Sequence, residues 1–84
     1  MLILATGTIT KPAETGPHMP EEIQVLNELK ATGPVRSAFR SAAQPAFISI
    51  LEAASIDDAK AHMNRLPFVA LGLMNLAYQE IAEL

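Results

Sequence analysis

The chain has 84 residues, of which 50% are apolar and 18% charged, with a net charge of −3 and no cysteine. A chain of this length is expected to form one domain, residues 1–84, which buries only about 60–65% of its unfolded surface. The six basic residues are spread along the chain, which excludes the clustered positive charge of a nucleic-acid binder. The lack of cysteine excludes disulfide scaffolds and thiolate metal sites, and it favours the cytoplasm.

The apolar content is higher than so small a monomer usually hides. A second copy is the simplest cover, so we expect a homo-oligomer, at least a dimer. The opening segment, Met1 to Ala5, lacks a basic leader, and no apolar run approaches the roughly 20 residues of a membrane span. We therefore expect neither a signal peptide nor a membrane partner.

The first half of the chain predicts a strand, a loop and a helix. Leu2 to Ile9 is apolar on both alternating faces, as in a central strand. Thr10 to Met19 is rich in proline and glycine, and loops of this length are either functional or disordered. The helix begins at Pro20 and ends at Gly33, a left-handed C-cap. Its buried stripe is predicted to be Ile23, Val25, Leu26 and Leu29.

Two strands joined by a turn at Gln44 and Pro45 follow. The first, Val35 to Ala42, is half polar, and the second, Ala46 to Glu52, is apolar on both sides and so central. Strict alternation predicts Val35, Ser37, Phe39 and Ser41 on one face of the first strand, and Arg36, Ala38 and Arg40 on a solvent-facing side. We interpret Ser49, in the second strand, as a small residue that permits close packing.

The last part of the chain predicts a capped helix and a strand. Ser55 and Asp58 form a capping-box pattern, in which Asp58 reaches back to the N-cap amide. The inner face of this helix is predicted to consist of Ile56, Ala59, Met63 and Leu66. A turn at Gly72 precedes the strand from Leu73 to Leu84, the most polar of the four.

The element order is therefore βαββαβ, a ferredoxin-like α+β fold. Two apolar strands and two half-polar strands predict a four-stranded antiparallel sheet in the order 4-1-3-2, with the second and fourth strands at the edges. Both helices then cover one face of the sheet and leave the other face for a partner.

Three segments, Arg36 to Arg40, Ala46 to Ile50 and Leu66 to Phe68, resemble the muconolactone isomerase family. That family has an Arg-x-x-aromatic-Arg strand, an Ala-x-x-Ser strand and a Leu-Pro-Leu after its second helix. Pro67 to Leu73 also resembles the ending of the YciI-like family. Both families belong to the dimeric α+β barrel superfamily, in which two sheets face each other across a dimer. The resemblance implies this fold, a homodimer and an enzyme that acts on a small lactone, enol or aromatic catabolite.

The chain departs from both families in their catalytic residues. Val35, Ser37 and Phe39 stand where the isomerase-like families have Trp and His, and Glu22 stands at the His position of the YciI-like pattern. Two alternatives therefore stay open: a non-catalytic small-molecule-binding or assembly module, and a cofactor-free monooxygenase. No cofactor and no metal site are expected.

Glu22 and His18 are the candidate catalytic residues. Glu22 is a general base if a pocket between helix and sheet desolvates it and raises its pKa. Alternatively, a glutamate in the first turn simply stabilises the helix dipole, by about 0.3–1 kcal/mol. His18, in the long loop, either titrates over a ligand or is an ordinary loop residue.

Arg36, Arg40 and Tyr78 are the candidate substrate-binding residues. The two arginines lie roughly 13 Å apart on an ideal strand. They either hold a carboxylate or a polarised lactone oxygen, or they are solvated and protect an edge strand from aggregation. Tyr78 either donates its hydroxyl to a ligand or packs in the dimer interface.

Overall fold

A computed structural model describes residues 1–43 and 46–84, so the predicted turn at Gln44 and Pro45 lies outside the described residues. In chain order the elements are β1 (Leu2–Ile9), the short 3₁₀ helices η1 (Pro12–Glu14) and η2 (Gly16–His18), α1 (Met19–Thr32), β2 (Val35–Arg40), β3 (Ala46–Glu52), α2 (Ile56–Met63), α3 (Pro67–Ala70) and β4 (Met74–Ile81).

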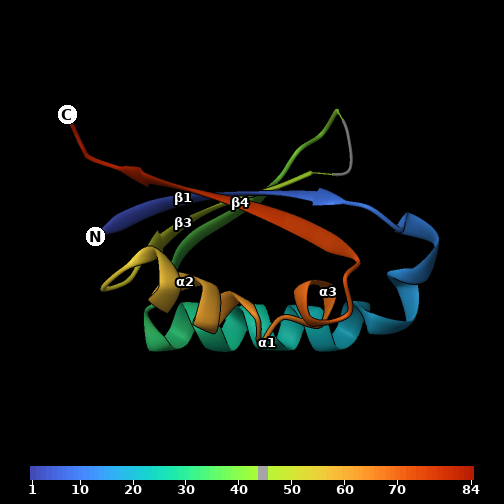
Figure 1. Ribbon diagram of the computed structural model, residues 1–84. Coiled ribbons are helices and arrows are strands. Elements are labelled where there is room, and N and C mark those ends of the chain that lie inside the picture. Colours follow the sequence, from blue (N-terminus) through green and yellow to red (C-terminus); the bar gives the residue numbers. More distant parts are fainter. Residues whose placement is uncertain (44–45) are drawn as a thin grey trace.

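The four strands form one antiparallel sheet in the order β2-β3-β1-β4, which confirms the predicted order. The central strands β1 and β3 have the bounds that the sequence predicts, because both are apolar on both faces. Figure 1 shows the sheet as one layer and the three α-helices as a second layer on one side of it. The prediction that the helices cover a single face is therefore confirmed, and the ferredoxin-like α+β fold with it.

The core lies between this helical layer and the sheet. Ile3 and Ala5 of β1 and Leu51 of β3 are at most 2% exposed. They pack with Leu29, Val35, Ala59, Met63 and Leu66. Ser49 is fully buried in the same layer, and its hydroxyl donates to the Ser37 carbonyl oxygen at 2.9 Å. Its polar group therefore has a partner, as burial requires.

The helix α1 confirms its predicted end but not its predicted buried face. Gly33 adopts a φ of 107° and closes the helix as a left-handed cap. The prediction for Ile23 was wrong, since its side chain is 51% exposed, whereas Glu22 is only 8% exposed. The inner positions are Glu22, Val25, Leu26 and Leu29. Their spacing fits one helix face as well as the predicted stripe does. Hydropathy alone rejects this face because it contains a carboxylate.

A β-bulge in β2 overturns the predicted strand faces. Val35 is paired with Leu51 and Ser37 with Ile50, so Arg36 is an extra residue with no partner in the register. Beyond the bulge the alternation is reversed. Ala38 pairs with Ser49 and Arg40 with Phe47, on the helix side of the sheet, while Phe39 pairs with Ile48 on the open side. The strand also ends at Arg40 rather than Ala42.

The segment after β3 follows the predicted capping pattern with small differences. The Ser55 hydroxyl accepts from the Asp58 amide at 3.0 Å, while the Asp58 carboxylate accepts from the Ala54 amide, one residue before the expected one. The helix α2 ends at Met63, and residues 67–70 form the additional short helix α3. Gly72 makes the predicted turn with a φ of 71°, and β4 is shorter than predicted at both ends.

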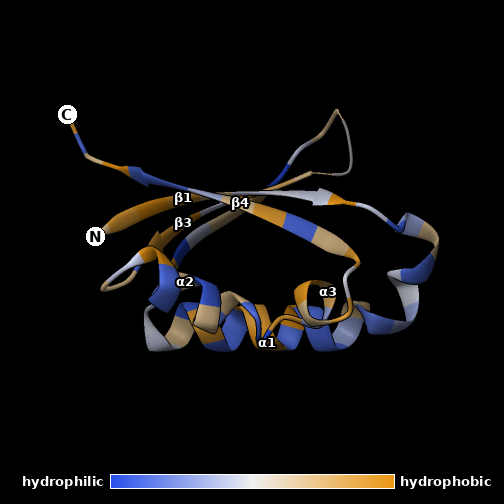
Figure 2. Cartoon of the chain, viewed as in Figure 1, coloured by the Kyte–Doolittle hydropathy of each residue, from blue (hydrophilic) through white to orange (hydrophobic). Residues whose placement is uncertain are grey.

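The face of the sheet opposite the helices carries exposed apolar side chains. Phe39 is 58% exposed and Ile48 is 37% exposed, side by side on β2 and β3. Figure 2 shows that β1 is also strongly apolar over its first half, near the N-terminus. Within the described part of the chain, no helix is both long enough and apolar enough to cross a membrane.

Candidate functional site

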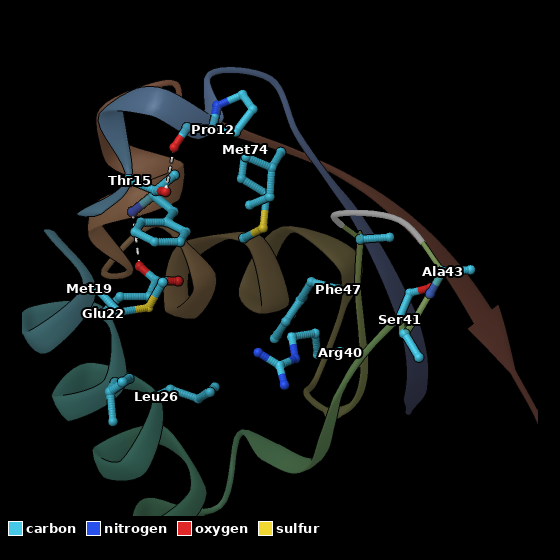
Figure 3. Close-up of a pocket in the computed structure, with 15 residues that line it drawn as sticks. Pro12, Thr15, Met19, Glu22, Leu26, Arg40, Ser41, Ala43, Phe47 and Met74 are labelled. Carbon is cyan, nitrogen blue, oxygen red and sulfur yellow. Dashed lines mark hydrogen bonds between the residues drawn. The ribbon is translucent and has the colours of Figure 1, made fainter.

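A cleft of about 900 Å³ lies between α1, the η1–η2 loop and the ends of β2 and β3. Among the described residues its lining is apolar except for Thr15, Glu22, Arg40 and Ser41. Figure 3 shows these side chains around the cavity, with Met19, Glu22 and Leu26 on one wall and Phe47 and Arg40 on the other. A mostly apolar cleft with a few converging polar groups is the usual form of a small-molecule site.

Glu22 is the buried carboxylate in the wall of this cleft. Its Oε1 accepts a hydrogen bond from the Phe68 backbone N–H at 2.9 Å, across 46 positions of sequence. Burial of the side chain raises the pKa of Glu22 above its ordinary value of 4.5, and the hydrogen bond from Phe68 offsets part of this effect. The carboxyl is therefore protonated at a higher pH than an exposed glutamate.

The same hydrogen bond positions α3. Phe68 lies in the first turn of α3, where backbone N–H groups have no partner within the helix, and the N-cap residue Leu66 makes no side-chain cap bond. Glu22 supplies the missing acceptor from another element. Phe68 in turn lines the cleft, so Glu22 fixes one of the walls of its own site.

Arg40 brings the only basic group among the described residues that line the cleft. The bulge in β2 places it on the helix side of the sheet, and Figure 3 shows its guanidinium pointing from the strand into the cavity. Within residues 1–43 and 46–84 it forms no salt bridge. A guanidinium in this position presents several donors to an anionic ligand group.

Two of the predicted site residues, Arg36 and His18, lie outside this cleft. Arg36 is exposed, and its guanidinium is 3.7 Å from the Glu52 carboxylate. The bulge at Arg36 separates it from Arg40 and from the cleft. His18 lies at the start of α1, outside the lining of the cleft, and its side chain makes no cap bond to the helix. The structure therefore brings Glu22 and Arg40 to one cleft and places Arg36 and His18 outside it.

Tyr78 lies at a second, smaller cleft of about 390 Å³ between α2, α3 and β4. The ammonium of Lys60 lies 5.7 Å from the centre of its ring, within cation–π range. Burial raises the pKa of the Tyr78 hydroxyl. Tyr78 therefore lies apart from the cleft that Glu22 and Arg40 line.

Within the described residues, no group of three or more histidine and acidic side chains is placed to hold a metal ion. The lining residues that sequence reasoning missed are mainly Met19, Phe47, Phe68 and Met74. Phe47 shares the sheet face of Arg40 only because of the bulge, and Phe68 belongs to the unpredicted helix α3. The sequence carries no local signal for either placement.

The element order, the sheet order and the single helical layer define the class of protein as ferredoxin-like α+β. Among solved structures, the crystal structure of muconolactone isomerase is similar to it, with a TM-score of 0.79. The two chains are 19% identical, and the match covers 99% of this chain and 90% of that one. This likeness confirms at the level of the fold the resemblance that the sequence motifs indicate. No family model and no curated protein matches the chain.

Proposed function

We propose that the protein is a small-molecule enzyme of the proton-transfer type, in which Glu22 exchanges a proton with a ligand held by Arg40. The observation that carries the proposal is a buried carboxyl with a raised pKa in the wall of a cleft that also holds a guanidinium. Such a group exchanges protons more readily near neutral pH than an exposed glutamate does. Of the two predicted catalytic residues, Glu22 is retained and His18 is not.

The chemistry that suits this pair is isomerisation of a lactone, an enol or a related carbonyl compound. Glu22 takes a proton from the carbon beside the carbonyl, the C–H bonding electrons move toward the carbonyl oxygen, and Arg40 stabilises the resulting oxyanion. Return of the proton from Glu22 to a different carbon completes the isomerisation, with no other reactant consumed. The fold shared with muconolactone isomerase supports this reaction class by analogy only.

The proposal includes a homodimer formed through the open face of the sheet. The exposed Phe39 and Ile48 on that face support it, because exposed apolar patches usually mark contacts. Residues 1–84 would act as one domain. A cytoplasmic location completes the proposal and rests on the cysteine-free composition.

A second candidate function is a non-catalytic small-molecule-binding or assembly module. The hydrogen bond between Glu22 and Phe68 favours it, because capping of α3 accounts for a buried carboxylate without any chemistry. The two candidates differ in whether Glu22 exchanges a proton with the bound ligand.

Proton exchange in D₂O separates the two candidates. Proton NMR of lactones and enolisable carbonyl compounds would follow the loss of the signal from the carbon-bound proton. The wild-type protein should accelerate this exchange, and Glu22→Gln, which keeps a hydrogen-bond acceptor for Phe68, should lower the rate about 10²–10⁴-fold. Glu21→Gln is the matched control, since Glu21 is exposed in the same helical turn. Equal exchange by Glu22→Gln and the wild-type protein would contradict the catalytic role.

A further inference from the structure

The main cleft is large in comparison with a compact lactone. Its volume of about 900 Å³ lies at the upper end of the roughly 300–1,000 Å³ that sites for drug-sized ligands occupy. A compact ligand held between Glu22 and Arg40 would leave much of this space to water. A ligand that fills the cleft has to extend along its apolar walls.

The rim of the cleft carries two large apolar side chains in contact with water. Met19 is 41% exposed and Ile23 is 51% exposed, and both line the cleft from α1. Met74 lies deeper and is only 3% exposed. Methionine side chains adapt their shape to irregular apolar partners, so this wall suits an extended hydrocarbon surface. Covering Met19 and Ile23 would remove apolar area from water, which favours binding.

The charges of the cleft select the sign of the ligand's polar end. Arg40 is the basic residue and Glu22 the acidic residue among the described lining residues. The Glu22 carboxylate already accepts from the Phe68 amide, whereas the Arg40 guanidinium points into the cavity. A single anionic group on the ligand therefore finds its complement at Arg40.

From these observations we propose that the ligand of the cleft is an amphipathic monoanion, with one carboxylate or enolate group paired to Arg40 and an extended apolar body covering Met19 and Ile23. This inference rests on the proposed function, because it assigns a ligand class to the same site. It replaces the small catabolite predicted from the sequence with a longer and more apolar molecule.

Isothermal titration calorimetry with a series of straight-chain carboxylates, butanoate to decanoate below their micelle concentrations, tests the apolar body. The dissociation constant should fall about fourfold for each methylene that enters the cleft. Ile23→Ser should weaken decanoate binding and leave butanoate binding unchanged. Leu71→Ser is the matched control, because Leu71 is 52% exposed and does not line the cleft. A dissociation constant independent of chain length would overturn the inference.

The anionic end is tested with octanoate, octanol and octylammonium. Arg40→Gln should weaken octanoate binding at least about tenfold, as expected for loss of a charged hydrogen-bonding partner, and leave octanol unaffected. Arg36→Gln is the control, since Arg36 pairs with Glu52 away from the cleft. Octylammonium binding as tight as that of octanoate would overturn the assignment of charge.

The proton-exchange assay distinguishes failure of the proposed enzyme from failure of the proposed ligand class. Chain-length-dependent binding without Glu22-dependent exchange supports the ligand class and refutes the enzyme. Exchange on compact lactones together with length-independent binding refutes the ligand class and supports the enzyme. Dissociation of a dimer by Ile23→Ser in sedimentation velocity would show that a second copy covers this rim, which also overturns the ligand class.

Discussion

Replacing Glu22 by Gln and by Leu separates its structural contribution from its charge. The Glu22 carboxylate accepts from the buried Phe68 N–H at 2.9 Å. Gln keeps an oxygen that can accept this bond, whereas Leu leaves the Phe68 N–H without a partner. An unsatisfied buried amide costs about 1–3 kcal/mol. The free energy of unfolding of Glu22→Leu should therefore be about 1–3 kcal/mol lower than that of Glu22→Gln.

The pH dependence of the same pair isolates the titration of Glu22. Because burial raises its folded-state pKa above 4.5, the folded protein keeps a proton that the unfolded chain has already released. The unfolding free energy contributed by Glu22 is then greatest below pH 4.5 and falls as the pH rises through the folded-state pKa. Glu22→Gln lacks this dependence, so the stability of wild type relative to Glu22→Gln should decline with increasing pH.

Urea denaturation followed by far-UV circular dichroism, between about pH 4 and pH 8, measures both effects. Equal stability of Glu22→Gln and Glu22→Leu would show that the bond to Phe68 contributes nothing to the fold. A constant difference between wild type and Glu22→Gln over this range would show that the carboxyl does not titrate with a raised pKa. Either result would refute the description of Glu22 as a buried capping carboxylate.

Two further predictions concern the sheet. Phe39→Asp places a charge on the open face, where Phe39 is 58% exposed, and should dissociate the proposed dimer without unfolding the chain. Sedimentation velocity identical to that of the wild type would contradict the proposed interface. Gly7→Ala adds a Cβ that would lie 2.9 Å from the Leu76 Cδ2 and Met74 Sδ atoms. It should lower the unfolding free energy by about 1–3 kcal/mol, and an unchanged urea midpoint would contradict this packing.

The elements that the sequence predicted well are those defined by local patterns. β1 and β3 are apolar on both faces, and Gly33 and Ser55 mark helix ends through backbone conformation and a hydroxyl acceptor. The bulge at Arg36 has no such local pattern, because it depends on how β2 pairs with β3. The prediction therefore holds for buried Val35 and exposed Arg36, and beyond Arg36 the predicted faces of β2 are reversed.

The candidate site was predicted only in part, because its geometry also depends on strand pairing. Glu22 was proposed as a base on condition that a pocket desolvates it, and the structure meets that condition. Arg40 was assigned to a solvent-facing side, and it is exposed, but the bulge places it on the helix side of the sheet, where it lines the cleft. Tyr78 faces the helical layer but lies beside Lys60, in the second cleft. Placing these side chains requires pairings between distant segments, which residue patterns along the chain do not contain.

The structural and chemical roles of Glu22 do not exclude each other. Within the described residues its hydrogen bond involves Oε1, and Oε2 has no partner. When Glu22 is protonated on Oε2, Oε1 still accepts from Phe68, so α3 can keep its cap while the proton moves. A carboxylate that serves only as a cap has no need to line a cleft with a guanidinium. Because Glu22→Gln preserves the cap and removes the mobile proton, the proton-exchange assay on that variant decides between the two functions proposed.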